Sequence, residues 1–259
     1  MMGILDQFRL DGQVAVVTGS GRGIGEGIAL GLAEAGADVV LTARRTKEIE
    51  AVAAKVRALG RRALAITADV MKIEEVQRIA DTTFKEMGKL TCWVSNAGGA
   101  DDRVPRTFMD MPERQWDFQL NLNLKAVWTG AQAAGRIMKE NGGGTIINIS
   151  SVAAGRASPN NGPYAVAKSG VNSLTQTLAA EMAPFGIRVN GVAPGPIPTE
   201  VFMEFLKLKP EDIPELGKRF GIPLGRLGTP EDIAPAVVFL ASPASSWMTG
   251  HTITISGGP

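Results

Sequence analysis

The side chains best suited to proton transfer are a tyrosine and a lysine at helical spacing. Tyr164 is the only tyrosine in the 259-residue chain, and Lys168 follows four positions later. On a helix the two side chains would share one face, one turn apart. Ser151 follows an apolar run, residues 145–149, that predicts a buried strand. A strand end, a loop and a helix can bring these three polar groups together, although a half-exposed aromatic beside a solvated amine explains the spacing of the pair more simply.

A glycine-rich segment stands between the first predicted strand, residues 13–17, and the first predicted helix, residues 24–35. In that position glycines let the backbone approach a pyrophosphate, and the helix N-terminus favours its negative charge. The spacing is Gly-x-x-x-Gly-x-Gly, and ordinary turns also use glycine. We interpret the segment as a phosphate-binding loop formed by Gly19, Gly21, Arg22, Gly23 and Ile24.

The end of the second predicted strand, residues 38–42, carries two arginines and no acidic residue. At this place in a dinucleotide-binding fold an acid reads a free ribose 2′-hydroxyl, whereas a base accommodates a 2′-phosphate. Arg44, together with Arg22 in the glycine-rich loop, therefore predicts NADP(H) rather than NAD(H). Arg44 and Arg45 could also end a strand in water, and we expect that of at least one of them.

Strand-like and helix-like segments alternate along the chain. Further strands are predicted at residues 62–67, 90–94, 145–149, 187–192 and 252–255, and helices at residues 46–59, 74–87, 112–139, 164–183 and 229–241. Strands separated by such helices need crossover connections. The sequence thus predicts an α/β fold: a single doubly wound, Rossmann-like domain, residues 1–259, with a parallel seven-stranded sheet and helices on both faces. Asn123 is a poor helix-interior residue, which indicates a local bend or a buried polar network.

Composition excludes several classes of function. A net charge of +1 gives no electrostatic basis for binding nucleic acid or an anionic membrane, and no apolar run approaches membrane-spanning length. One cysteine, Cys92, and one histidine, His251, cannot form a Cys/His metal site, and a serine hydrolase would depend on His251. Without an internal disulfide or a secretory signal in residues 1–11, we expect a cytoplasmic protein that holds no metal.

The least regular stretch, residues 199–220, mixes an apolar stripe with charged residues. An amphipathic surface helix and a lid over an apolar substrate fit this pattern equally. In the second interpretation, a lid at about residues 197–225 covers a substrate pocket lined by Val152, Phe202, Phe205 and Leu206.

The motifs in this order, over residues 10–258, resemble the classical short-chain dehydrogenase/reductase family. The resemblance rests on Thr18-Gly19-x-x-x-Gly23-Ile24-Gly25, Asn96-Ala97-Gly98, Asn123, Ser151, Tyr164 with Lys168, and Pro194-Gly195 through Thr199. It implies a nicotinamide cofactor across the carboxyl ends of the strands and a catalytic set of Asn123, Ser151, Tyr164 and Lys168. It also implies homotetramers that pack through the helices at residues 112–139 and 164–183.

Two positions depart from the family pattern. Ser95 stands where the family usually has the first Asn of Asn-Asn-Ala-Gly, which changes a contact that stabilises the strand end. The tail reads Ser256-Gly257-Gly258 where the family usually has Asp-Gly-Gly and continues, which bears on tetramer contacts rather than on catalysis.

The resemblance and the strand ends together assign the cofactor site. Asp69 and Val70 follow the third predicted strand, where Asp69 would touch an adenine ring or cap the next helix. Ile197 and Thr199 would contact the carboxamide. The remaining contacts are expected from Asn96, Ala97, Gly98, Tyr164, Lys168, Pro194 and Gly195.

Tyr164 is expected to act as the general acid and base of a hydride-transfer reaction. A free tyrosine has a pKa near ~10, and an ammonium about 4 Å away, at an effective dielectric near 20, would contribute about 4 kcal/mol, or roughly 3 pKa units, towards tyrosinate. The phenol would protonate a carbonyl oxygen during reduction, with Ser151 hydrogen-bonded to that oxygen. Lys168 would also bind ribose hydroxyls, and the resemblance suggests that Asn123 holds a water linking Lys168 to solvent.

We therefore expect an NADP(H)-dependent oxidoreductase that interconverts a small-molecule ketone and a secondary alcohol. The pattern is similar to bacterial hydroxysteroid dehydrogenases, whose bulky substrates suit the apolar stripe, and equally to 3-oxoacyl-carrier-protein reductases. A carrier protein would need a basic docking face, to which Arg103, Arg106 and Arg156 could contribute. A function of another class, a non-catalytic NADP-binding regulator, would require a lost catalytic residue.

Overall fold

A single parallel sheet organises the structure, a computed structural model that describes residues 3–99 and 104–258. The strand order is β3-β2-β1-β4-β5-β6-β7. The strands are β1 (Val14–Thr18), β2 (Asp38–Ala43), β3 (Ala63–Thr67), β4 (Cys92–Ser95), β5 (Gly144–Ile149), β6 (Ile187–Pro194) and β7 (Thr252–Ile255). All six neighbouring pairs are parallel, so the predicted doubly wound fold is confirmed.

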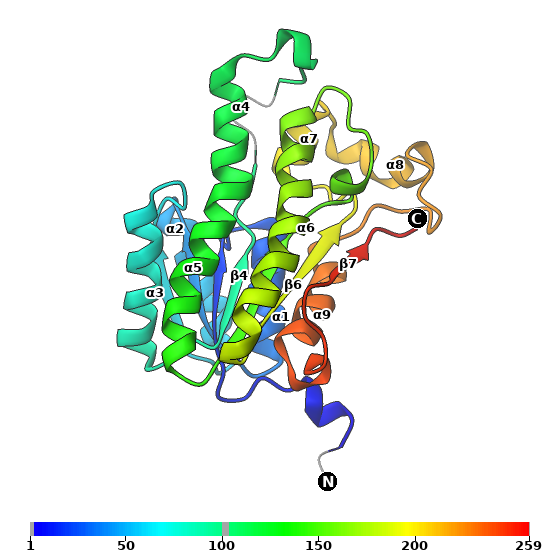
Figure 1. Cartoon of the computed structure of the whole chain (residues 1–259). Helices are drawn as coiled ribbons and strands as arrows, with labels where there is room; N and C mark the ends of the chain where they lie inside the picture. Colours follow the sequence, from blue (N-terminus) through cyan, green and yellow to red (C-terminus); the bar gives the residue numbers. More distant parts are fainter. Residues whose placement is uncertain (1–2, 100–103, 259) are drawn as a thin grey trace.

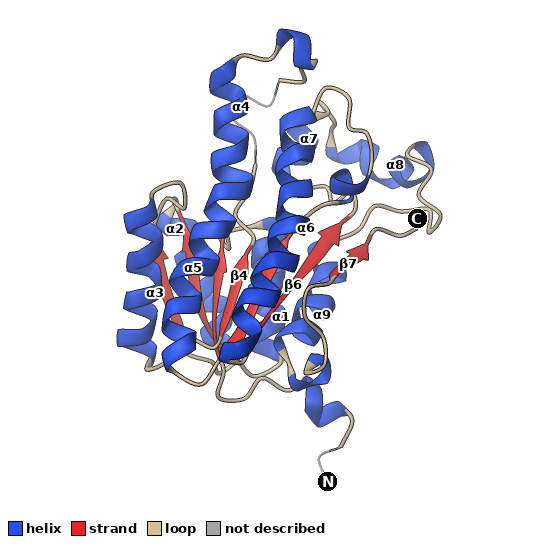
Figure 2. Cartoon of the chain, viewed as in Figure 1, coloured by secondary structure: helices blue, strands red, loops and turns tan. Residues whose placement is uncertain are grey.

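Helices cover both faces of the sheet (Figure 2). They are α1 (Gly23–Glu34), α2 (Thr46–Ala58), α3 (Ile73–Met87), α4 (Glu113–Leu120), α5 (Ala126–Glu140), α6 (Gly162–Met182), α7 (Glu200–Phe205), α8 (Ile213–Arg219) and α9 (Pro230–Ala241). One core cluster joins α1, α2 and α9 to the sheet, and the other joins α3, α5 and α6. No helix among the described residues is long and apolar enough to cross a membrane.

The order of the strands fixes where a ligand can bind. The chain builds β1, β2 and β3 outward in one direction and then crosses to place β4 on the other side of β1. The loops that leave β1 and β4 consequently diverge, which opens a crevice at the carboxyl ends of these strands. In Figure 1, α4, α7 and α8 project from this end of the molecule, and the N-terminus lies at the opposite end.

The helix predicted at residues 112–139 is interrupted. It begins at Glu113, passes through a π-helical turn at Asn121–Lys125, and ends at Glu140. A π turn inserts one extra residue into the helical path, and such turns are frequent at functional sites. The buried Asn123 lies in this turn, so the sequence correctly marked an irregularity whose form it did not specify.

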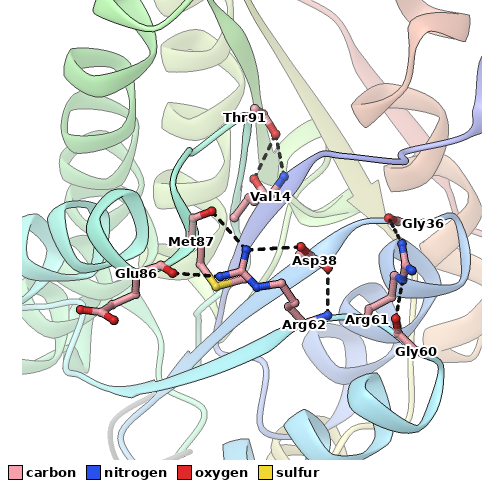
Figure 3. Close-up of polar contacts among 9 residues, drawn as sticks. All are labelled: Val14, Gly36, Asp38, Gly60, Arg61, Arg62, Glu86, Met87 and Thr91. Atoms are coloured by element: carbon pink, nitrogen blue, oxygen red, sulfur yellow. Dashed lines mark hydrogen bonds and ion pairs between the residues drawn. The ribbon is translucent and has the colours of Figure 1, made fainter.

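The amino ends of the strands are closed by structural hydrogen bonds (Figure 3). The Arg62 guanidinium donates to the carbonyl oxygens of Glu86 at 2.9 Å and Met87 at 3.4 Å, at the end of α3. The Arg62 backbone N–H donates to Asp38 at 2.8 Å. These contacts satisfy carbonyl oxygens that the end of a helix leaves without a partner, so they stabilise the fold at this edge of the sheet.

The departure from the family pattern at Ser95 has a packing explanation. Trp93 in β4 is 1% exposed, and its indole N–H donates to the Ser95 hydroxyl at 3.1 Å. A buried indole needs such an acceptor. Gly130 in α5 lies against the same ring, because a Cβ there would be 2.6 Å from the indole nitrogen. Trp93, Ser95 and Gly130 thus form one packing unit.

Gly130→Ala should destabilise the protein by about 1–3 kcal/mol, because the added methyl overlaps the Trp93 ring. Urea unfolding measures the change. Gly155→Ala is the matched control, since a Cβ at Gly155 meets nothing within 4 Å. Trp93→Leu is itself destabilising, but Gly130→Ala should cost less in the Trp93→Leu background than in wild type. Equal effects of the two glycine substitutions would contradict the packing unit.

Candidate functional site

Lys168 is held in place by the end of β5. Its amine donates to the carbonyl oxygen of Ile149 at 2.7 Å, and the Ser150 hydroxyl donates to the Lys168 carbonyl oxygen at 3.2 Å. These two bonds fix α6 against the strand end. Tyr164, one turn earlier on α6, is thereby placed at the carboxyl edge of the sheet, as its spacing from Lys168 predicts.

Ser151 is oriented by its own loop. Its hydroxyl oxygen accepts a hydrogen bond from the Ala153 N–H at 3.1 Å, at the start of a short 3₁₀ turn. With one lone pair used in this way, the hydroxyl proton is free to be donated outward. A side-chain hydrogen bond from Ser151 favours the ionised form of Tyr164, so the structure brings these two predicted residues together.

The pKa of Tyr164 departs from the expected direction. Burial raises the pKa of the phenol, and the hydrogen bond from Ser151 lowers it only in part. Burial also lowers the pKa of the Lys168 amine to about 8. The amine lies 5.7 Å from the centre of the Tyr164 ring and bonds to the Ile149 carbonyl. Desolvation thus outweighs the attraction that was expected to favour tyrosinate.

Asn123 lies at the centre of a buried hydrogen-bond network. Its Nδ2 donates to Gln119 Oε1 at 2.7 Å and to the Gly99 carbonyl oxygen at 3.0 Å, and its Oδ1 accepts from the Gly99 N–H at 3.2 Å. A Cβ on Gly98 would lie 2.9 Å from Asn123 Oδ1 and 3.9 Å from Lys168 Nζ. The loop after β4, the π turn and α6 therefore meet at one point.

The glycine-rich loop has the features of a dinucleotide cradle. Gly25 packs against the carbonyl oxygen of Gly19, where a Cβ would overlap it, and Gly23 has a φ of +56°. Arg22 precedes α1 without a side-chain capping bond, so the first N–H groups of this helix have no side-chain acceptor there. A pyrophosphate suits such a helix N-terminus. These residues fit the nicotinamide dinucleotide that the sequence predicts.

The loop after β4 is fastened to the glycine-rich loop. Asn96 Nδ2 donates to the carbonyl oxygens of Thr18 at 2.8 Å and Gly19 at 3.2 Å. The backbone N–H groups of Asn96 and Ala97 both donate to the Thr18 hydroxyl at 2.9 Å. The Asn96 side chain therefore shapes the cradle rather than projecting from it.

The three candidate arginines have different surroundings. Arg22 forms an ion pair with Glu200, at the start of α7. Arg45 forms an ion pair with Glu48 at 2.9 Å. Arg44 follows β2, is exposed, and has no ion-pair partner among the described residues. Of the two arginines at this strand end, Arg45 is therefore the one that forms a surface ion pair.

Asp69 shapes the turn before α3. Its carboxylate accepts a hydrogen bond from the Met71 N–H at 3.0 Å. The N-cap of α3 is Lys72, which has no side-chain capping bond, so Asp69 does not cap this helix as expected. Val70 is half-buried and packs against the core cluster on the α3 side.

The elbow after β6 also lies at the carboxyl edge of the sheet. β6 ends at Pro194, and a Cβ on Gly195 would overlap the chain near Ser256. Ile197 is 5% exposed. The Thr199 hydroxyl accepts from the Phe202 N–H at 3.3 Å and so caps α7, while its methyl group approaches Gly23. The elbow thus contacts the glycine-rich loop.

The predicted substrate-pocket residues divide into three groups. Phe205 lines a hollow beside the N-terminal end of α6. Phe202 packs edge-on against Phe220, with ring centres 6.2 Å apart, and Leu206 is 39% exposed. Val152 is half-buried directly after Ser151. Of these four residues, Phe205 is the one that lines the hollow beside α6.

Two residues of the site were missed in the sequence. Gln119 is 4% exposed and bonds to Asn123, and Glu200 pairs with Arg22. Gln119 precedes Asn123 by four positions, a helical spacing that could have linked them. No sequence signal joins Glu200 to Arg22, because the two come together only through the fold.

Comparisons with known proteins agree with this geometry. A family profile described as enoyl-(acyl carrier protein) reductase matches residues 19–259. The 7α-hydroxysteroid dehydrogenase of Escherichia coli K12 is 37% identical over 255 residues, covering 98% of this chain and 96% of the relative. Both matches span nearly the whole α/β fold.

Two solved structures are similar along their full length. A 7α-hydroxysteroid dehydrogenase complexed with NADH and 7-oxo glycochenodeoxycholic acid has a TM-score of 0.91 at 37% identity, covering 100% of this chain and 98% of that one. A gluconate 5-dehydrogenase from Burkholderia cenocepacia J2315, complexed with NADP and tartrate, has a TM-score of 0.90 at 37% identity, covering 98% of both. This chain belongs to the short-chain dehydrogenase/reductase family, oxidoreductases that act on secondary alcohols and ketones with a nicotinamide cofactor.

Proposed function

We propose that this protein is an NADP(H)-dependent oxidoreductase in which Tyr164 is the general acid and base. The observation that carries the proposal is the convergence of Tyr164, Ser151 and Lys168 at the end of β5. The glycine-rich loop lies at the same edge of the sheet, two strands away. A family member that retains all of these groups is better explained as an enzyme than as a non-catalytic NADP-binding regulator.

The protein's own residues supply the proton and position the substrate. A bound nicotinamide carries the hydride. Tyr164 donates its phenolic proton to the carbonyl oxygen in reduction, and its raised pKa keeps that proton in place at neutral pH. Ser151 donates its hydroxyl proton to the same oxygen and stabilises the charge that develops there. Lys168 binds ribose hydroxyls, and Asn123 holds the water that links Lys168 to solvent.

The cofactor preference is assigned to Arg44. Its exposed guanidinium at the end of β2 is available to a 2′-phosphate, whereas Arg22 and Arg45 are paired with Glu200 and Glu48. The two similar solved structures hold NADH in one case and NADP in the other, so the family alone does not decide. The base at this strand end favours NADP(H).

The substrate is a small ketone or secondary alcohol, and the steroid-like alternative rests on the relatives and on Phe205 at the hollow. For a 3-oxoacyl-carrier-protein reductase the docking arginines matter. Arg106 is bonded internally to Gln115 at 2.6 Å, Arg156 is exposed, and Arg103 lies outside the described residues. These arginines form no docking face among the described residues, and the carrier-protein alternative rests on a 3-oxoacyl-carrier-protein reductase that is 38% identical over 251 residues.

Assembly as a homotetramer is part of the proposal, through α4 with α5 and through α6. A broad surface groove between these helices is lined by Leu120, Leu124, Trp128, Leu174 and neighbouring residues. Apolar residues along an exposed groove of this kind suit contact with a second copy.

Tyr164→Phe should abolish turnover while leaving cofactor binding intact, because it removes only the transferable proton. We expect kcat to fall by roughly two to four orders of magnitude. Quenching of intrinsic fluorescence by NADPH should be unchanged and serves as the control. A near-wild-type kcat on a good ketone substrate would overturn the assignment of Tyr164.

Lys168→Met should reveal the buried amine through the pH dependence of stability. The folded pKa of about 8 lies below the ordinary lysine value of 10.5, so ionisation opposes folding. This penalty is complete below pH 8 and is relieved as pH rises towards 10.5, and the methionine variant lacks it. The free energy of unfolding of Lys168→Met relative to wild type should therefore fall by about 2 kcal/mol between pH 7.5 and pH 9.5.

Urea unfolding of both proteins at the two pH values measures this difference. Alkaline effects shared by the two chains cancel in the comparison. A difference in stability that stays constant with pH would show that the Lys168 amine titrates normally.

Arg44→Asp should shift the cofactor preference from NADPH towards NADH, because it replaces a phosphate-binding cation with a carboxylate that suits a free 2′-hydroxyl. We expect the ratio of kcat/KM for NADPH to that for NADH to fall by roughly 10- to 100-fold, the value of one charge-assisted hydrogen bond. Arg45→Ser is the matched control and should change the ratio far less, since Arg45 is paired with Glu48. Equal shifts in both variants would reject Arg44 as the determinant.

A further inference from the structure

A small hollow opens between α4, the N-terminal end of α6, and α7. Its volume is about 10 Å³, room for one water-sized group, and its lining includes Gln119, Asn161, Pro163 and Phe205. Pro163 directly precedes Tyr164, and Gln119 is hydrogen-bonded to Asn123. The hollow therefore lies one residue along the chain from Tyr164 and one hydrogen bond from Asn123, although neither lines it.

The orientation of the Gln119 amide follows from its neighbour. Asn123 Oδ1 accepts the Gly99 N–H at 3.2 Å, so Asn123 Nδ2 is the donor that faces Gln119. The Gln119 atom that meets it at 2.7 Å must then be the oxygen, Oε1. This leaves Gln119 Nε2 as a donor on the other side of the amide.

Gln119 Nε2 has no hydrogen-bond partner among the described residues, although the side chain is 4% exposed. In that part of the chain, the fully enclosed side-chain atoms without a partner are Thr42 Oγ1 and Asn148 Oδ1. Gln119 Nε2 is not one of them, so this atom is not fully enclosed. Gln119 lines the hollow, which is the open space that Nε2 can face. A buried donor without an acceptor is costly, and a ligand oxygen would satisfy it.

A second amide lines the same hollow. Asn161 stands at the N-terminus of α6 but makes no capping bond with its side chain. Gln115 is already used, because it accepts from Arg106 at 2.6 Å and donates to the Val104 carbonyl at 3.4 Å. Asn160 also lines the hollow but is exposed, so Gln119 and the half-buried Asn161 are the more enclosed amides available to a ligand.

The rest of the lining carries no net charge. Val104, Met111, Pro163 and Phe205 supply apolar surface, and the other lining residues are amides. The Arg106 guanidinium is bonded to Gln115 of this lining at 2.6 Å, so an ionised carboxylate would have to displace that bond to pair with it. A wholly apolar group would leave the Gln119 donor unsatisfied.

We infer that this hollow is a specificity subsite that binds an uncharged oxygen, a hydroxyl or a carbonyl, on the substrate at a distance from its reacting carbon. Gln119 Nε2 donates to this oxygen, the Asn161 amide completes its hydrogen bonding, and Phe205 with Pro163 packs on the adjoining carbon skeleton. The inference rests on the proposed function, because it takes Tyr164 as the place where the reacting carbonyl binds. It selects hydroxylated ketones over both plain hydrocarbon ketones and keto acids.

The test uses a fused-ring decalone series: the parent ketone, positional isomers that carry one hydroxyl, and a carboxylate analogue. Calorimetry gives Kd for each in the presence of NADP, and NADPH consumption gives kcat/KM. The proteins are wild type, Gln119→Leu, Asn161→Ala, and Gln77→Leu as the matched control on α3. Comparing ratios between two ligands cancels any loss common to both, including one that reaches Asn123 through Gln119.

We expect wild type to prefer one hydroxylated isomer over the parent by about tenfold in both Kd and kcat/KM, the value of one hydrogen bond. In Gln119→Leu and Asn161→Ala this preference should shrink towards one, while Gln77→Leu retains it. Equal binding of all isomers and the parent, preference for the carboxylate, or an unchanged preference in both variants would overturn the subsite. Preferential binding without turnover of any ketone would instead overturn the proposed function and leave the subsite standing.

Discussion

The hydrogen bond from the Lys168 amine to the Ile149 carbonyl is the contact on which the geometry of the site depends. At 2.7 Å it joins the buried side chain of α6 to the last residue of β5. Burial of an amine is costly, and this bond offsets part of that cost while fixing the rotation of α6. Tyr164 and Ser151 are positioned by the same junction, one by the helix and the other by the strand. A helix that turned slightly about its axis would separate them.

Side-chain hydrogen bonds between distant segments connect this junction to the rest of the carboxyl edge of the sheet. Asn96 binds the loop of β4 to the end of β1, and Asn123 binds the π turn to Gly99. These ties occupy side chains that the sequence had offered as ligand contacts. The donors left for a cofactor are therefore mainly backbone N–H groups at the start of α1. Such groups can bind a phosphate that approaches the backbone closely, without a long side chain.

The sequence predicts the order of the elements and the identity of the convergent residues because both follow from local patterns. Apolar runs become parallel strands, and the polar residues that follow them must collect at one edge. Asn123 marked an irregularity in this helix, but its form, the π turn at Asn121–Lys125, was not predicted because an inserted residue leaves the apolar periodicity almost unchanged. The ion pair of Arg22 with Glu200 and the direction of the Tyr164 pKa depend on burial and tertiary contact, which a spacing rule does not contain.

The inner face of α4 carries buried amides that each need a hydrogen-bond partner. Gln115, Gln119 and Asn123 recur at intervals of four and so line one face that continues into the π turn. A helix face that buries three amides gives up the apolar contact that normally stabilises it, so each amide needs a partner. Arg106 serves the first and Gly99 the last, and each of these bonds ties α4 to the loop after β4. Gln119, in the middle, satisfies its oxygen on Asn123 and lines the hollow. The polar row thus connects Asn123 to the hollow that we propose as a substrate subsite, through a single side-chain amide.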